Sequence, residues 1–255
     1  MELKGRRALI TGSAKGLGKR TAQLLADAGC DVVVNYVTSR AEAEALAEDL
    51  RGRGVRSAAV QADVADPKQV ERLAEEAERL LGGIDILINN AGPFIRERRL
   101  FAEYTPDEII GLVNGNLLGV MLLDRLLLPG MRQRGWGRII HFGFGHAGES
   151  RAWPHRAVYA AAKTALVSFT KTLAVEEAAH GITVNMICPG DIRGANKEKS
   201  IDDVRNEIDP ETHRRPGTGE DVARAILFLC DPKSDFITGN LLDVTGGFDP
   251  IRNTV

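Results

Sequence analysis

The sequence predicts a single doubly wound α/β domain, residues 1–255, with a mostly parallel seven-stranded sheet and helices on both faces. Two observations carry this prediction. Seven short runs rich in Val, Ile and Leu alternate with long helical stretches, and these runs are continuously apolar. Such runs are typical of parallel strands that helices cover on both sides. The chain has 255 residues, 44% of them hydrophobic, so it can bury a sizeable core.

The elements follow one another in order from the N-terminus. Strands are expected at 6–11, 30–36, 55–63, 84–92, 137–143, 182–190 and 241–245. Helices are expected at 17–29, 40–54, 67–83, 105–134, 154–180 and 219–230. Helices of this amphipathic kind bury one face against a sheet. Since no linker or internal repeat interrupts the alternation, we expect one Rossmann-type domain.

Residues 191–215, "DIRGANKEKSIDDVRNEIDPETHRR", break the pattern. They are polar and charged, without a clear apolar face. The segment is either a solvated excursion or a mobile substrate lid. A long insertion after the carboxyl end of a strand lies beside the ligand crevice of such a sheet. The sequence supports both readings about equally.

Composition argues against several classes of function. The net charge is −2 with both signs mixed, so nothing favours nucleic acid or an anionic membrane as a partner. No apolar run approaches the roughly 18 residues of a membrane span, and the first strand leaves no room for a signal peptide. Cys30, Cys188 and Cys230 each end an apolar run, which favours reduced core thiols over a disulfide or metal site. We therefore expect a cytoplasmic protein without a metal.

A glycine-rich turn, "LITGSAKGLGKR", joins the first strand to the first helix. It contains Gly12, Gly16 and Gly18. Glycines here let the backbone approach a pyrophosphate, and the free N–H groups and dipole of the helix N-terminus favour an anion. A glycine triplet alone is a weak signal. Its position after the first strand of an α/β chain predicts a dinucleotide site.

The T-G-x-x-x-G-x-G spacing of this turn resembles that of the short-chain dehydrogenase/reductase family. The resemblance extends over nearly the whole chain, through "NNAG" at 89–92, "NLLG" at 116–119, a Y-x-x-x-K pair at 159–163 and "CPGDI" at 188–192. Within the family the chain looks most like the 3-oxoacyl-carrier-protein reductase group. The resemblance implies a cofactor site formed by Gly12, Ser13, Lys15, Gly16, Leu17, Gly18, Tyr36, Thr38, Ser39, Arg40, Asp63, Val64, Asn90, Ala91, Gly92, Tyr159, Lys163, Pro189, Gly190 and Ile192.

The end of the second strand indicates which nicotinamide cofactor is used. NAD enzymes place Asp or Glu there to bind the ribose 2′-hydroxyl, and that charge repels a 2′-phosphate. Here Tyr36 stands at that place, followed by Thr38, Ser39 and Arg40, and Lys15 lies in the glycine turn. The cations could be ordinary solvated charges. Two cations, two hydroxyls and a missing acid nevertheless favour NADP(H).

Tyr159 and Lys163 lie one helical turn apart, so both side chains are expected on the same face. Carbonyl reduction by hydride transfer needs a proton for the carbonyl oxygen. A free tyrosine has a pKa near ~10, and a neighbouring ammonium is expected to lower it by favouring the phenolate. The resemblance implies that Tyr159 donates the proton, Lys163 also holds the nicotinamide ribose, and Asn116 helps to hold a water molecule for proton relay. Asn114 is the alternative, but the following "LLG" fits Asn116 better.

The family places a serine just beyond the fifth strand, and this chain has none there. Counting forward from Arg138 reaches Phe144, whereas counting thirteen residues back from Tyr159 reaches His146. The loop is therefore longer than usual. Ser150 is the nearest hydroxyl, but it lies only nine residues before the tyrosine. His146 can donate a hydrogen bond and is the candidate substitute, although a lone loop histidine is more often simply solvated.

Two functions fit these observations. The first is an NADP(H)-dependent oxidoreductase that reduces a ketone or 3-oxoacyl carbonyl of a small molecule to an alcohol. The second is a catalytically weakened NADP(H)-binding protein with a regulatory or structural role. The lost serine favours the second. The retained Tyr159, Lys163 and Asn116 favour the first, because a decayed site need not keep all three.

Two further sets of apolar residues bear on substrate and assembly. Helical stretches 105–134 and 154–180 carry apolar residues on more than one face, more than one sheet can bury. Because the family pairs such helices between subunits, we expect a homotetramer. Four aromatic residues could line an apolar pocket or belong to the core: Phe94, Phe142, Phe144 and Trp153.

Overall fold

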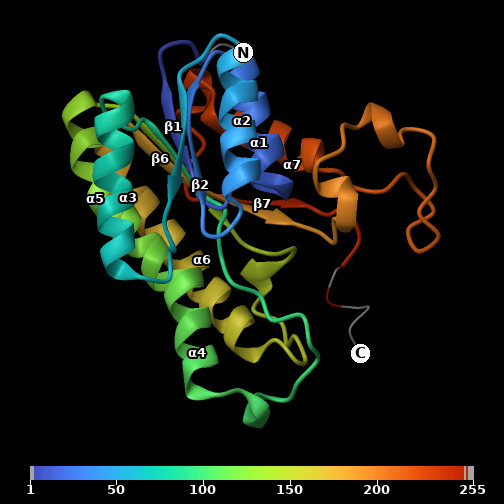
Figure 1. Ribbon diagram of the computed structural model, residues 1–255. Helices are drawn as coiled ribbons and strands as arrows, with labels where there is room; N and C mark the ends of the chain where they lie inside the picture. Colours follow the sequence, from blue (N-terminus) through green and yellow to red (C-terminus); the bar gives the residue numbers. More distant parts are fainter. Residues whose placement is uncertain (1–2, 250, 252–255) are drawn as a thin grey trace.

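The computed structural model describes residues 3–249 and 251, which form a seven-stranded parallel sheet between two layers of helices (Figure 1). The strand order is β3-β2-β1-β4-β5-β6-β7. The strands are β1 (Arg7–Ile10), β2 (Asp31–Tyr36), β3 (Ser57–Gln61), β4 (Ile86–Asn89), β5 (Gly137–Phe142), β6 (Ile182–Pro189) and β7 (Leu241–Val244). The helices are α1 (Gly16–Asp27), α2 (Arg40–Gly52), α3 (Pro67–Leu81), α4 (Pro106–Val113), α5 (Gly119–Arg134), α6 (Ala157–Glu177) and α7 (Gly219–Cys230). The fold class expected from the sequence is confirmed.

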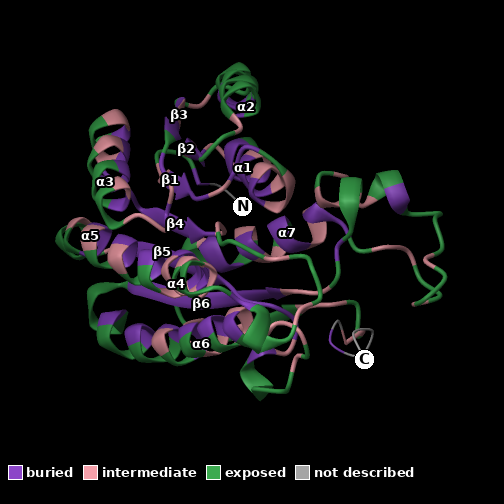
Figure 2. Ribbon diagram, turned by 60° about the horizontal axis from the view of Figure 1, so that its bottom comes forward, coloured by how far each residue is buried: buried purple, intermediate pink, exposed green. Residues whose placement is uncertain are grey.

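Successive residues of the central strands pack on opposite faces of the sheet, as a strand's two-residue period requires. Ile10 and Val34 belong to the core beneath α1, α2 and α7. Leu9 and Val33 belong to the core beneath α3, α5 and α6. All four side chains are completely buried, and Figure 2 shows the buried strands between the two helical layers. This double coverage explains why the strand runs are continuously apolar.

Local sequence sets the helix ends. Asp66 caps α3, because its side chain accepts hydrogen bonds from the backbone N–H groups of Lys68 and Gln69. Pro67 follows at the first helical position, where its missing N–H costs nothing. Gly82 ends the helix with φ of 80°, a left-handed conformation that suits glycine.

The expected helix 105–134 is divided by one π-helical turn, Asn114–Leu118, which lies between α4 and α5. By length and composition Pro106–Arg134 could cross a membrane, with a mean hydropathy of 1.4 over its most apolar window. The expectation that no stretch approaches membrane length is therefore corrected. Leu123 and Leu127 of this stretch are buried in the same core as α3 and the sheet, as in a core helix of a globular domain.

A buried polar cluster connects β4 and β5 to α5 and α6. The carboxylate of Asp124 accepts a hydrogen bond from Asn89 Nδ2 (2.8 Å) and lies 2.8 Å from Nε2 of His141. The other ring nitrogen of His141 lies 2.8 Å from the hydroxyl of Thr170. Each residue finds a polar partner, the condition for burying such groups. The cluster ties together the strands and helices that carry the site described below.

The winding of the sheet reverses at β1, which has β2 on one side and β4 on the other. A crevice therefore opens at the carboxyl ends of β1 and β4, where such sheets bind ligands. Segment 191–215 follows β6 and projects from the body of the domain (orange in Figure 1). It contains two short 3₁₀ turns, Gly194–Lys197 and Asp202–Val204, and Val204 is its fully buried anchor.

Candidate active site

Tyr159 and Lys163 lie in the first two turns of α6 and line a cavity of about 390 Å³. The Nζ atom of Lys163 lies 5.9 Å from the centre of the tyrosine ring. The remaining lining residues come from the glycine turn, the ends of β4, β5 and β6 and the loops around them: Leu17, Asn90, Gly92, Phe94, Asn116, Phe142, Gly143, Phe144, Trp153, Arg156, Pro189, Gly190, Asp191, Ile192 and Lys197. One cavity thus contains the predicted catalytic Tyr, Lys and Asn together with predicted cofactor residues.

Burial dominates the ionisation of the pair. It raises the pKa of Tyr159 to about 12, because a phenolate in the cavity would lose its hydration. It lowers the pKa of Lys163 to about 8 for the same reason. The expectation that the lysine lowers the tyrosine pKa is therefore wrong for the protein alone, since desolvation is the largest influence and raises the pKa of Tyr159. Tyr159 remains a protonated phenol at neutral pH.

Asn116 lies in the π-helical turn between α4 and α5, a local distortion often found at functional sites. Its Nδ2 donates to the carbonyl oxygens of Pro93 (2.8 Å) and Leu112 (3.0 Å). Its Oδ1 is buried, and no residue that the structure describes donates a hydrogen bond to it. A Cβ atom on Gly92 would lie 2.3 Å from that oxygen and 3.6 Å from Nζ of Lys163. The oxygen therefore lies close to Lys163, and only glycine at position 92 leaves room for it.

Phe144 stands in the cavity at the position reached by counting from the strand side. Its ring centre lies 6.2 Å from that of Tyr159 and 4.8 Å from that of Trp153. His146 is not among the lining residues, and its Nδ1 lies 3.0 Å from a carboxylate oxygen of Glu149. The contacts of His146 therefore give no support to its expected role as the substitute donor, which stays a prediction.

Two asparagine side chains, one on β2 and one directly after β4, hold the glycine turn in shape. The N–H of Gly12 donates to Oδ1 of Asn35 (3.0 Å), and Nδ2 of Asn90 donates to the carbonyl oxygens of Thr11 (2.8 Å) and Gly12 (2.9 Å). A Cβ atom on Gly18 would lie 2.7 Å from the Gly12 carbonyl oxygen, so the third glycine permits close packing. Sequence reasoning missed Asn35; its signal was one amide inside the apolar run "VVVNY".

The N-terminus of α1 already has an acidic partner. The N–H of Gly16 donates to Oε1 of Glu198 (2.8 Å), and Nζ of Lys19 lies 2.7 Å from Oε2 of the same carboxylate. Glu198 belongs to segment 191–215, 182 residues away in sequence, and no local pattern predicted the contact. An anionic oxygen at this N–H group shows that the turn suits a phosphate group. The residues present therefore fit the diphosphate of a dinucleotide.

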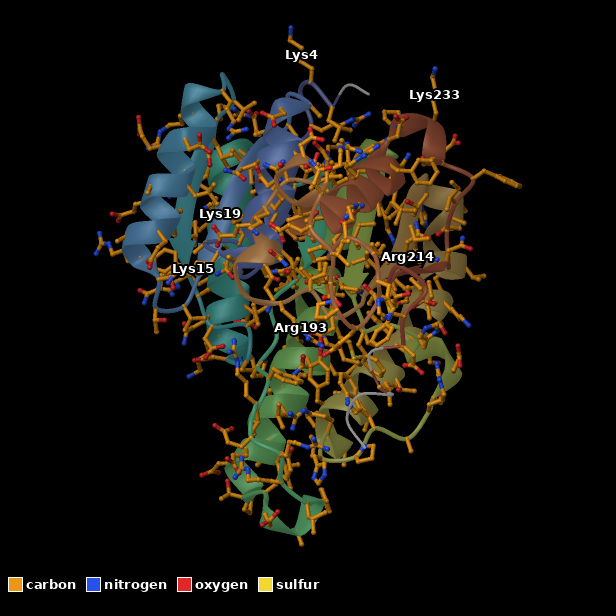
Figure 3. All side chains as sticks on the ribbon, turned by 90° about the vertical axis from the view of Figure 1, so that its right-hand side faces the viewer. Lys4, Lys15, Lys19, Arg193, Arg214 and Lys233 are labelled. Carbon is orange, nitrogen blue, oxygen red and sulfur yellow. The ribbon has the colours of Figure 1, made fainter. Side chains whose placement is uncertain are left out.

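The residues predicted to choose between the nicotinamides lie at the end of β2 and in the glycine turn. Tyr36 is buried, whereas Arg40 and Lys15 are exposed and pair with Glu44 (2.7 Å) and Glu42 (2.6 Å). Figure 3 shows Lys15 and Lys19 at the left of the view, and Arg193 and Arg214 of segment 191–215 near its centre and to the right of it. The two predicted cations are thus free to exchange an exposed carboxylate for another anion.

Other predicted cofactor residues shape the backbone around the crevice. The hydroxyl of Ser13 donates to the Ile10 carbonyl oxygen and accepts from the N–H of Asn35. The N–H of Ala91 donates to the Thr11 hydroxyl (2.9 Å). The remaining members lie at the strand ends or lead into α2: Thr38, Ser39, Asp63, Val64, Pro189, Gly190 and Ile192.

Comparison with known proteins agrees with this site. Residues 12–249 match the family model described as "Enoyl-(Acyl carrier protein) reductase". The chain is 45% identical over 249 residues to "Putative oxidoreductase YtkK" of Bacillus subtilis (strain 168), covering 97% of this chain and 98% of the relative. The chain belongs to the short-chain dehydrogenase/reductase family. The family expected from the motifs is therefore confirmed. Members of this family include oxidoreductases.

Two further relatives show which members of the short-chain dehydrogenase/reductase family this chain is similar to. The 3-oxoacyl-[acyl-carrier-protein] reductase FabG of Staphylococcus epidermidis (strain ATCC 35984) is 35% identical over 243 residues, covering 94% of this chain and 97% of the relative. The crystal structure of a blue fluorescent protein from a metagenomic library in complex with NADPH superposes with a TM-score of 0.85 at 34% identity, covering 97% of this chain and 99% of that one. Both similarities extend over essentially the whole domain.

Proposed function

We propose that the protein is an NADP(H)-dependent reductase that converts a ketone or 3-oxoacyl carbonyl into an alcohol. The observation that carries the proposal is the meeting of Tyr159, Lys163 and Asn116 in one cavity beside the glycine turn. Family membership and the FabG relatives support carbonyl reduction of a small molecule. The NADPH complex of a structural relative supports the choice of cofactor.

Each residue of the cavity has a distinct task in this reaction. The bound nicotinamide supplies the hydride. Tyr159, protonated because its pKa is raised to about 12, gives the phenol proton to the carbonyl oxygen as the alcohol forms. The Lys163 ammonium holds the nicotinamide ribose. Asn116 Oδ1, which has no partner among the described residues, accepts a hydrogen bond from a relay water. The aromatic wall of the cavity limits access of bulk water to this proton transfer.

Segment 191–215 is a substrate lid in this proposal, because Glu198 and its neighbours contact the cofactor and substrate sites. The segment begins beside the cavity, which Asp191, Ile192 and Lys197 help to line. It also reaches the glycine turn through Glu198. A segment that contacts both the cavity and the glycine turn can respond to the cofactor and cover the substrate.

The preference for NADP(H) rests on Lys15 and Arg40 and on the absence of an acid after β2. A 2′-phosphate would replace Glu42 and Glu44 as the partner of these exposed cations. We expect fluorescence titration to show tighter binding of NADPH than of NADH. Arg40→Ala should weaken NADPH binding and leave NADH binding unchanged. Equal or tighter binding of NADH by the wild-type protein would contradict the preference.

Phe144 in place of the serine favours a second function, an NADP(H)-binding protein with a regulatory or structural role. The two functions differ in one assay. A reductase oxidises NADPH in the presence of ketones or 3-oxoacyl thioesters and forms a stoichiometric amount of alcohol. A binding protein takes up NADPH without turning it over on any member of such a panel.

Exposed apolar side chains support a homotetramer, for which we propose a cytoplasmic location. Ile110 and Met121 on the α4–α5 stretch, and Val175 on α6, are 55%, 37% and 79% exposed. A second group lies on and beside α7 and β7, where Phe228 and Phe236 are 47% and 99% exposed. Two separate apolar faces suit two interfaces of a tetramer with two-fold axes. Light scattering should give four times the 27.6 kDa of one chain, and a monomer at micromolar concentration would contradict the proposal.

A further inference from the structure

The cavity lacks the serine hydroxyl of its family, and four backbone N–H groups of the loop after β5 have partners elsewhere. Gly143 donates to the carbonyl oxygen of Ile187, and Gly145 donates to that of Pro189. His146 donates to a carboxylate oxygen of Asp243. The N–H of Ala147 is hydrogen-bonded within the loop, to the Phe144 carbonyl oxygen. None of these four groups is available to a substrate.

Most other donors that line the cavity are also engaged. Arg156 donates to the carbonyl oxygens of Arg96 (2.8 Å) and Glu97 (2.9 Å), and so holds the loop after β4. The amide of Asn90 serves the glycine turn. Lys197 lies against that turn, with its Cδ 3.8 Å from the position of a Cβ on Gly16. The Lys197 side chain therefore lies at the end of the cavity that we assign to the diphosphate.

Trp153 carries a donor that the described residues 3–249 and 251 leave unused. Its Nε1 is buried, and none of these residues accepts a hydrogen bond from it. The indole lines the cavity, with its ring centre 4.8 Å from that of Phe144 and 6.0 Å from that of Tyr159. The interplanar angle with Tyr159 is 78°, so the two rings meet edge to face. A buried N–H without an acceptor, beside the proton donor, requires an explanation.

We propose that the indole N–H of Trp153 takes the place of the missing serine hydroxyl. It donates a hydrogen bond to the carbonyl oxygen of the substrate while Tyr159 transfers its proton to that oxygen. No bond of the indole breaks: hydride from NADPH reaches the carbonyl carbon, and the proton comes from Tyr159. The inference rests on the proposed reductase function. The indole must turn slightly toward the cavity when a carbonyl enters, because its N–H is shielded from solvent in the protein alone.

The physical reason is the charge that grows on the carbonyl oxygen as hydride arrives. A second fixed donor stabilises that charge in a cavity from which water is excluded. The phenylalanine that replaces the serine also serves this arrangement, because the Phe144 ring packs against the indole at an interplanar angle of 53°. The substituted loop thus supplies both the donor and its support.

Trp153→Phe is the direct test, since it keeps an aromatic ring and removes the N–H. We expect kcat/KM for the acetoacetyl thioester of N-acetylcysteamine to fall on the order of 10²-fold, mainly through kcat. NADPH affinity should not change. The chain has two tryptophans, so Trp136→Phe is the matched control. Trp136 packs between Arg6 (3.7 Å) and Arg138 (4.4 Å), and its replacement should leave activity intact.

A second variant asks whether a hydroxyl can replace the indole. Trp153→Phe combined with Phe144→Ser should recover at least part of the lost kcat, because the serine restores a donor on the loop. Recovery would show that the loss came from the missing donor and not from a change of pocket shape. A double variant no more active than Trp153→Phe would count against the proposal.

The wild-type protein gives an independent readout through its indole N–H resonances. In protein labelled with ¹⁵N-tryptophan, the Trp153 resonance, assigned with the Trp136→Phe variant, should move downfield when NADP⁺ and the acetoacetyl thioester bind together. NADP⁺ alone should leave it in place. A resonance that does not move, or Trp153→Phe with wild-type kcat, would show that the indole N–H does not bind the substrate and that the proposal is wrong. Failure of the wild type to reduce any carbonyl would instead overturn the reductase function as well.

Discussion

Removal of the Glu198 side chain should strengthen cofactor binding, although it removes two contacts. In the protein alone, its carboxylate occupies the N–H of Gly16 and pairs with Lys19. The diphosphate of NADP(H) needs the same helix terminus, so the carboxylate must leave before it binds. Desolvation tends to raise the pKa of Glu198, but the hydrogen bonds from Gly16 and Lys19 prevail and lower it. The group is therefore a carboxylate at neutral pH.

The size of the effect follows from the exposure of the contact. The side chains of Lys19 and Glu198 are 34% and 38% exposed, so solvent screens the ion pair. Such a pair contributes about 0.2–1 kcal/mol, and a carboxylate at a helix N-terminus about 0.3–1 kcal/mol. The contact as a whole is then worth about 1 kcal/mol, or about a fivefold change in an equilibrium constant. A competing contact reduces the apparent affinity by that factor.

The assay is fluorescence titration of Glu198→Ala with NADPH, beside Glu207→Ala as a control. Glu207 lies in the same segment and pairs with Lys199 (3.2 Å). Its loss makes the same change of charge without freeing the glycine turn. We expect the dissociation constant to fall about fivefold for Glu198→Ala and to stay within about twofold of wild type for Glu207→Ala. An unchanged or higher dissociation constant for Glu198→Ala would refute the reasoning.

Three further predictions concern the catalytic residues. Phe144→Ser should raise kcat/KM if the strand-side count is correct, because the new hydroxyl then outweighs the loss of the ring that packs against Trp153. Thermal denaturation should show a loss of about 3 kcal/mol because a buried ring is removed. Lower activity in a folded variant would contradict the expected gain. His146→Ala should leave kcat/KM nearly unchanged, because the imidazole lies against Glu149, and a loss of one to two orders of magnitude would restore His146 as the donor. The value of kcat/KM for reduction should fall as the pH rises through about 8, because Lys163 loses its proton there. Tyr159, with a pKa of about 12, stays protonated over this range. A profile flat to pH 10 would show that the lysine charge is not needed.

Much of the fold could be predicted because its signals are local. Continuous apolar runs mark strands that are covered on both faces, and Gly12 at the first turn marks the start of the crevice. The four-residue spacing of Tyr159 and Lys163 places both on one helix face. Asn116 could be chosen over Asn114 from its neighbours, and Asn116 is the one that lines the cavity.

Features that depend on distant parts of the chain escaped prediction. Glu198 lies in a charged stretch without any pattern, yet it meets Gly16 from 182 residues away. Asp124 and His141 read as single polar residues in apolar elements, and only their packing reveals a joined cluster. The pKa of Tyr159 was expected in the wrong direction, because the sequence shows that a lysine is near but does not show how deeply both groups are buried.

The missing serine is a second case in which the sequence names candidate residues but does not place their side chains. Sequence counting named Phe144 and His146 as alternatives but could not place either side chain. The structure puts the Phe144 ring in the cavity and directs the His146 imidazole to Glu149. Trp153, expected either in a pocket wall or in the core, proves to line the cavity, and its N–H has no partner within residues 3–249 and 251.

We expect this chain to reduce carbonyl compounds with Tyr159 as proton donor although its serine is lost. The most direct measurement compares NADPH oxidation, with alcohol product quantified, for wild type and Tyr159→Phe across ketones and 3-oxoacyl thioesters. A single missing donor typically costs about 10²–10³ in rate, a fraction of the total acceleration by an enzyme, so the wild type should reduce at least one compound. Tyr159→Phe should bind NADPH normally and form no alcohol. Equal NADPH oxidation by both proteins, or no product from either, would contradict the claim and favour a nucleotide-binding role.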